Sequence, residues 1–109
     1  MLKGVSRVGE TNNMESMLGL GQDNALMRFT MSKAFIKHGK FVEAAEQLAL
    51  ALKLEPEYSA AWKLYAQTLI ELNQINAAIE AYEQGISVAN RKSDLQLAVE
   101  MKAALQRLQ

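Results

Sequence analysis

The side chains that could do acid–base or nucleophilic chemistry are few in this sequence and lie far apart. The chain has no Cys and a single His, His38, which excludes a thiol nucleophile, a thiolate metal site and a disulfide. His38 stands next to Gly in a turn between two expected helices, so we expect a solvated residue. Glu43, Glu46 and Glu80 have helical spacing relative to neighbouring Ala and Leu. They therefore indicate an exposed helix face rather than a general acid–base pair.

The sequence also lacks the patterns that bind phosphate or nucleic acid. Gly19 and Gly21 have neither the strand nor the Lys-Ser/Thr pair that a phosphate-binding loop requires. Arg91-Lys92 is too short for a nucleic-acid patch, and we expect it to place favourable charge at a helix C-terminus. Twelve basic and twelve acidic side chains leave no net charge, so the overall field favours neither nucleic acid nor an acidic membrane. We expect no enzyme, no cofactor, and no nucleic-acid or membrane partner.

Length and composition favour one small helical domain. The chain has 109 residues, half of them apolar, and only one Pro, which leaves long stretches free to form helices. No apolar run approaches the roughly 18 residues that a membrane span needs. The first ten residues lack the apolar centre of a secretory signal. These features predict a cytoplasmic protein.

The spacing of apolar residues predicts five helices after residue 23. The first follows Asp23-Asn24, two residue types favoured at N-caps, and ends at the turn 38–40. The next three are expected at about 41–54, 59–72 and 75–89, and Pro56 closes the second of the five. The last begins at Ser93, with Gln96 placed to complete a capping box. The sequence predicts a flexible leader at residues 1–13 and a domain at 14–109. Within this domain, a short helix is expected at 14–20.

A two-helix pattern recurs at a spacing of 34 residues. Ala44 recurs as Ala78 and Ile36 as Ile70, while other equivalent pairs agree in residue class, as Leu48 does with Tyr82. A period of this length is typical of helix–turn–helix repeats that stack on their neighbours. Such stacks usually bind other proteins.

These residues resemble the tetratricopeptide repeat. A first repeat of 25–58 places Met31, Ser32, Phe35, Gly39, Ala44, Leu48, Ala51 and Pro56 at motif positions, and a second of 59–92 places Trp62, Tyr65, Ala66, Leu69, Ala78, Tyr82 and Gly85 there. Arg28 departs from the usual Trp, Asn90 from Pro, and Gly85 from Ala. The resemblance implies an all-α fold, an α-α superhelix of about two repeats with a C-terminal capping helix at 93–109.

Close packing explains the small residues of this motif. We expect the Ala positions where paired helices approach each other, and a tight contact at Gly85, which costs about 1 kcal/mol against Ala in a helix. Trp62 is expected to fill the space between neighbouring helices. Two repeats alone are marginal, so the terminal helices act as caps, or the chain dimerises weakly through an exposed end.

The resemblance also implies a groove lined by the first helices of the repeats. Position by position, it assigns the groove to Phe29, Lys33, Ile36, Lys63, Gln67 and Ile70. Lys33 and Lys63 would receive a carboxylate and Gln67 would donate a hydrogen bond. The alternatives are that both lysines are simply solvated and that Phe29 and Ile36 belong to the core. The two-carboxylate clamp of chaperone-binding members is not expected, because Leu97 and Met101 are apolar where it needs basic residues.

The function that these expectations imply is non-catalytic. The chain would bind a peptide or helix of a partner protein in its concave groove. The alternative is a structural subunit that self-associates through its terminal helices. Exposed apolar residues on the last helix would favour the subunit, and an open apolar groove rimmed by lysines would favour docking.

Overall fold

The computed structural model describes residues 23–109, and this range holds five helices and no strand. They are α3 (Ala25–Lys37), α4 (Phe41–Leu54), α5 (Ser59–Glu71), α6 (Ile75–Arg91) and α7 (Leu95–Leu108). The predicted all-α fold is confirmed. The expected leader at 1–13 and the short helix at 14–20 lie outside the described residues. None of the five helices is long and apolar enough to cross a membrane.

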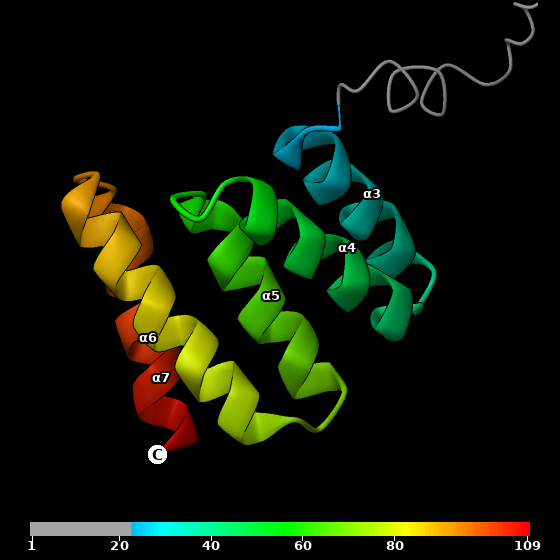
Figure 1. Cartoon of the computed structure of the whole chain (residues 1–109). Coiled ribbons are helices and arrows are strands. Elements are labelled where there is room, and N and C mark those ends of the chain that lie inside the picture. The colour runs from blue at the N-terminus through cyan, green and yellow to red at the C-terminus, as the bar shows by residue number, and fades with distance from the viewer. Residues whose placement is uncertain (1–22) are drawn as a thin grey trace, which may run out of the picture.

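The helices stack in chain order. Each packs on the helix that follows it, and α7 also contacts α5. In Figure 1, α6 lies in front of α7, and α5 runs between α4 and α6. Helices α3, α5 and α7 are the first members of successive helix pairs, and α4 and α6 are the second members, so α5 has neighbours on both sides.

One turn geometry recurs at three of the four connections between helices, namely α3–α4, α5–α6 and α6–α7. Gly39, Asn73 and Ser93 adopt left-handed backbone conformations with φ of 72°, 62° and 61°. The amide that follows each of them donates to a carbonyl five residues back, at 2.8–2.9 Å. This is the Schellman ending, which satisfies carbonyls at the end of the preceding helix. The repeated turn gives α3–α4, α5–α6 and α6–α7 the same antiparallel arrangement.

Two expectations about the last turn are wrong. Helix α7 begins at Leu95, not Ser93, and Ser93 forms the left-handed turn instead of a capping box. Asp94 stands at the N-cap without a side-chain cap bond, and its carboxylate instead accepts from Ser59 Oγ at 2.6 Å. Helix α6 continues to Arg91 rather than ending at residue 89.

The side chains of Arg91 and Lys92 hold the loop between α4 and α5. Arg91 Nη2 lies 2.6 Å from a carboxylate oxygen of Glu57, and its Nη1 donates to Ser87 Oγ at 2.9 Å. Lys92 Nζ donates to the backbone carbonyl of Glu57 at 2.9 Å. These contacts support the two extra residues of α6 and give this basic pair a role beyond charge at a helix end.

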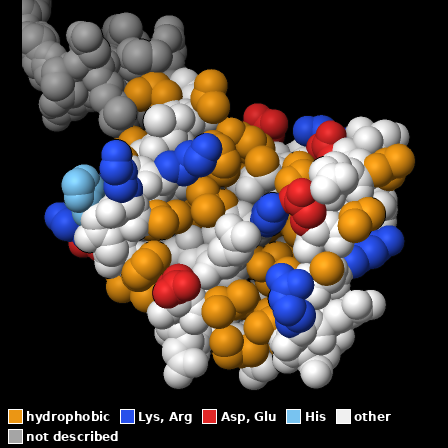
Figure 2. All heavy atoms as spheres, turned by 180° about the vertical axis from the view of Figure 1, so that it is seen from behind, with side chains coloured by type: hydrophobic (Ala, Val, Ile, Leu, Met, Phe, Trp, Pro, Cys, Tyr) orange, Lys and Arg blue, Asp and Glu red, His pale blue; other side chains and the backbone are white. Residues whose placement is uncertain are grey.

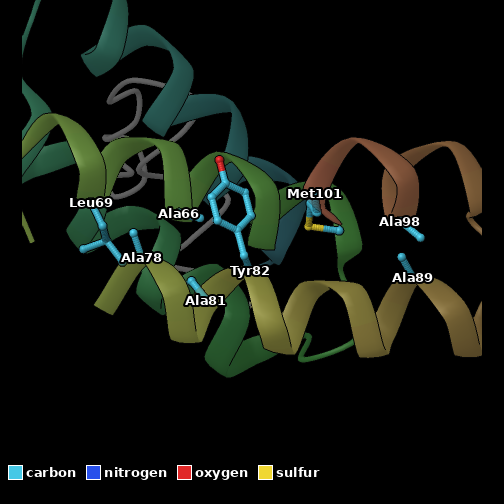
Figure 3. Close-up of a cluster of buried hydrophobic side chains, with 8 residues drawn as sticks. All are labelled: Ala66, Leu69, Ala78, Ala81, Tyr82, Ala89, Ala98 and Met101. Carbon is cyan, nitrogen blue, oxygen red and sulfur yellow. The ribbon is translucent and has the colours of Figure 1, made fainter. Parts of the chain in front are cut away.

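The main core lies between α5, α6 and α7. Figure 3 shows its buried side chains, which are Ala66, Leu69, Ala78, Ala81, Tyr82, Ala89, Ala98 and Met101. Gly85 is buried here, and a Cβ on it would lie 2.6 Å from Met101 Sδ and 2.8 Å from Trp62 Cβ. The expected tight contact at Gly85 is confirmed.

A second, smaller cluster joins the two helix pairs. Leu48, Leu52 and Ala61 are buried together, and Phe29 and Tyr58 pack against them. This cluster holds α3 and α4 against α5, so the position of α3 relative to α5 is set by side-chain packing.

Candidate functional site

An open hollow of about 460 Å³ lies between α3, the start of α4, and α5. Its lining consists of Ile36, Phe41, Leu64, Gln67, Thr68 and Glu71. We call this surface the α3–α5 hollow. Figure 2 shows the molecule from the side opposite to Figure 1, where hydrophobic side chains spread across the middle and basic side chains lie among them.

The structure brings two of the six expected groove residues into this hollow. Ile36 contributes from α3 and Gln67 from α5, and the Gln67 side chain is exposed. Lys33 lies one helical turn before Ile36 and is also exposed. Its Nζ is 5.0 Å from the centroid of the Phe29 ring, a distance at which a cation is attracted to the ring face. Lys33 thus stands near the hollow with its charge still accessible to solvent.

Phe29 and Ile70 take structural positions. The Phe29 ring stacks at 5.0 Å and 39° on Tyr58 and packs against the Leu48 cluster. Ile70 packs against the core between α5 and α6. Neither residue lines the α3–α5 hollow.

Lys63 is held by α7. Its Nζ lies 2.5 Å from Glu100 Oε1, and Gln96 donates to the other oxygen of Glu100 at 2.9 Å. The hydrogen bond from Lys63, followed by that from Gln96, keeps the pKa of Glu100 below its ordinary value. A ligand carboxylate would therefore have to compete with Glu100 for Lys63.

Sequence reasoning missed four residues of the lining. Leu64, Thr68 and Glu71 share a helical stripe with Gln67, at intervals of three or four residues, so their spacing could have revealed them. Phe41 begins the next helix and gave no such signal. The Thr68 hydroxyl is buried and donates to the Leu64 carbonyl at 2.8 Å, so Thr68 shapes the wall and its hydroxyl proton is already used.

The lining of the hollow is suited to binding more than to catalysis. It offers apolar surface from Ile36, Phe41 and Leu64, one exposed amide and one carboxylate, Glu71. Across residues 23–109, no three His, Asp or Glu side chains come together as a metal-ligand set. Apolar walls with a few polar groups that fix orientation are typical of ligand sites.

Comparison with known proteins gives the family. The tetratricopeptide repeat model matches residues 35–105. A TPR repeat-containing protein of Pseudomonas aeruginosa is 37% identical over 95 residues, which cover 87% of this chain and 90% of that protein.

Solved structures agree in fold. A Bordetella parapertussis protein known from a solution structure is 37% identical, with a TM-score of 0.74 over 91% of this chain and 86% of its own. The crystal structure of a Salinibacter ruber tetratricopeptide repeat domain protein has a TM-score of 0.74 at 20% identity, covering 79% and 96% of the two chains. Such repeats are generally non-catalytic scaffolds that mediate protein–protein interaction. The chain belongs to the tetratricopeptide repeat family.

Proposed function

We propose that this protein binds a segment of a partner protein, an extended peptide or a helix, in the α3–α5 hollow. The observation that carries the proposal is the hollow itself, whose volume of about 460 Å³ has room for several side chains. Its apolar wall would bury apolar groups of the partner, which is the main favourable term in association. No enzymatic step is part of the proposal.

Two exposed polar side chains would orient the bound segment. Gln67 lies in the wall and offers an amide that both donates and accepts. Lys33 makes no ion pair with any residue of 23–109, so within this range no carboxylate competes with that of a partner. Lys63 contributes only if the bound segment draws it away from Glu100. This favours a partner with an acidic group near Lys33.

The test uses three baits in affinity capture from lysate of the source cells, read by mass spectrometry. They are the wild type, Gln67→Trp, which fills the hollow, and the control Gln106→Trp. Gln106 is exposed on α7 and lies outside the hollow, so both variants add the same bulk to the surface. Circular dichroism melting of each bait shows that it is folded.

The expected result is a partner recovered with the wild type and with Gln106→Trp but not with Gln67→Trp. Titration calorimetry with that partner and Lys33→Glu should then show weaker binding, because the charge that meets the partner carboxylate is reversed. Recovery of the same proteins by all three baits would show that the partner does not bind in the α3–α5 hollow.

A structural subunit is the second candidate, and one observation favours it. Leu95 and Val99 lie one turn apart on α7 and are 63% and 60% exposed. An apolar strip of this kind could seat a second copy, although single exposed apolar residues are common on monomers. Sedimentation equilibrium separates the candidates. A dimer that Leu95→Ser with Val99→Ser abolishes would support the subunit, and a monomer at all concentrations would reject it.

A further inference from the structure

A second open surface lies over α5 between α4 and α6. One hollow of about 260 Å³ is lined by Val42, Ala45, Glu46, Ala49, Tyr65, Leu69, Leu72 and Gln74. Another of about 220 Å³ is lined by Trp62, Tyr65, Leu69, Ala77, Glu80, Ala81 and Gln84. Tyr65 and Leu69 line both, so the two hollows are adjacent. We call them together the α4–α6 furrow, and it shares no lining residue with the α3–α5 hollow.

Small side chains keep this furrow open. Ala45 and Ala49 lie one turn apart on α4, and Ala77 and Ala81 lie one turn apart on α6. In Figure 1 these two helices face each other across α5. Rows of small residues form grooves into which the side-chain ridge of another helix can pack. The shape therefore suits a helix better than a compact small ligand.

The charged groups that residues 23–109 contribute to the furrow are both acidic. Glu46 lines the part next to α4 and Glu80 the part next to α6, and both are exposed. Neither carboxylate forms a hydrogen bond or ion pair with another residue of the described range. Among residues 23–109, no Lys, Arg or His belongs to either lining. Two carboxylates thus flank an apolar floor with their charges uncompensated.

Two aromatic rings strengthen the preference for a cation. The Trp62 and Tyr65 ring centroids are 6.5 Å apart with an interplanar angle of 57°, and both rings line the same hollow as Glu80. Lys or Arg side chains are attracted to such ring faces, and a carboxylate beside the rings adds an ion pair. An acidic lipid surface or a nucleic acid would be repelled by Glu46 and Glu80.

We propose that the α4–α6 furrow is a second docking surface that takes an amphipathic helix with Lys or Arg beside its apolar face. This goes beyond the proposed function, because it adds a site on different helices with the opposite charge preference. The apolar face of the helix packs on Leu69 and the Ala rows. Its basic residues meet Glu46 on one side, and Glu80 with Trp62 and Tyr65 on the other.

The experiment measures binding of a fluorescein-labelled synthetic helical peptide made of Leu, Ala and Lys, by fluorescence anisotropy with the full chain. Its counterpart carries Glu at every Lys position. The test variant is Glu46→Gln with Glu80→Gln. The matched control is Glu43→Gln with Glu83→Gln, since these carboxylates are exposed on the same two helices but outside both linings. The two doubles therefore change the net charge equally.

The expected result is that the test double binds the Lys peptide about ten-fold more weakly than wild type, because two partly exposed ion pairs with the peptide are lost. The control double and Gln67→Trp keep the wild-type affinity, and the Glu peptide does not bind. Amide chemical shifts of ¹⁵N-labelled protein should move at Ala45, Ala49 and Ala81.

Four results of the peptide experiment would overturn the proposal. They are an equal loss of affinity in both doubles, equal binding of the Glu peptide, shifts confined to the α3–α5 hollow, and no binding of the Lys peptide at about 1 mM. A dimer of the wild type that the test double fails to form would also overturn it, because a second copy would then be the occupant.

Discussion

Gly85 is the residue at which the packing is tightest. An Ala in a helix is normally favoured over Gly by about 1 kcal/mol, but the new methyl would lie 2.8 Å from Trp62 Cβ and 2.6 Å from Met101 Sδ. The Met101 side chain can turn away, whereas Trp62 Cβ is fixed to its backbone. We expect Gly85→Ala to lower the free energy of unfolding by about 1–3 kcal/mol. Urea unfolding measures it, with exposed Asn76→Ala on the same helix as control. A stabilised Gly85→Ala would show that α5 and α6 lie further apart.

Trp62 connects the two core clusters. Its ring packs against both, and its indole N–H donates to the Pro56 carbonyl at 2.8 Å. We expect Trp62→Ala to cost about 3–5 kcal/mol and Trp62→Phe distinctly less, since Phe keeps most of the contact and loses the hydrogen bond. Thermal melting of the three proteins gives the order. An unchanged Tm in Trp62→Ala would contradict the packing described at this position.

Single residues also show how far the sequence could predict the binding surface. The resemblance to the tetratricopeptide repeat assigned Ile36 and Gln67 to one groove, and the structure brings both into one hollow. It could not reveal that Lys63 is engaged, because Glu100 is 37 positions away on another helix. Helical spacing gives the face of a residue, but the partner of an ion pair depends on how helices stack.

At the scale of elements, the residue type at each left-handed turn position decided whether the helix boundaries were predicted correctly. Gly39 in the first turn and Asn73 in the second are types that tolerate left-handed conformations, and the boundaries next to them were predicted within one residue. Ser93 occupies the same place in the third turn and resembles an N-cap in sequence. The sequence signal favoured a cap, while the stacking of α7 on α6 imposed the turn.

This conflict at Ser93 can be tested. The left-handed conformation costs a non-Gly residue about 1–2 kcal/mol. Replacement by Gly removes this cost, but it also raises the conformational entropy of the unfolded chain, which offsets part of the stabilisation. We expect Ser93→Gly to stabilise the fold by about 0.5–1 kcal/mol, and Asn73→Gly by less because Asn tolerates this conformation. Chemical unfolding of both variants provides the comparison. A less stable Ser93→Gly would mean that the Ser side chain stabilises the turn.

The contact between Lys63 and Glu100 attaches α7 to α5, and it should depend on pH. Because the folded-state pKa of Glu100 lies below the ordinary 4.5, the pair stabilises the fold above that value and loses its effect as the pH falls through the folded-state pKa. We expect Glu100→Gln to melt at a lower temperature than wild type at neutral pH, with the difference shrinking in acid. Melting curves over a pH series test this. A difference that persists undiminished below the folded-state pKa would assign the effect to packing.

Over the whole molecule, the balance of charge conceals a separation. Helices α4 and α6 carry four Glu and two basic residues, whereas α3, α5 and α7 carry six basic residues and two Glu. This separation arises only when alternate helices fold onto different sides of the molecule. The net charge of the sequence therefore indicated no preference for a charged partner. The two docking proposals use this separation, with an acidic group expected near Lys33 and basic groups in the α4–α6 furrow.

The stacked architecture also predicts how stability is distributed. Each helix packs mainly on its chain neighbours, and in such folds stability is approximately a sum over neighbouring units. Met101 is fully buried between α7 and α6, so Met101→Ala should open a cavity costing about 2–5 kcal/mol there. We expect hydrogen exchange by mass spectrometry to show protection lost chiefly in α6 and α7, while α3 and α4 change little. Loss of equal size in all five helices would instead mean that the described range unfolds as one cooperative unit, in which a partner bound at either surface would stabilise both.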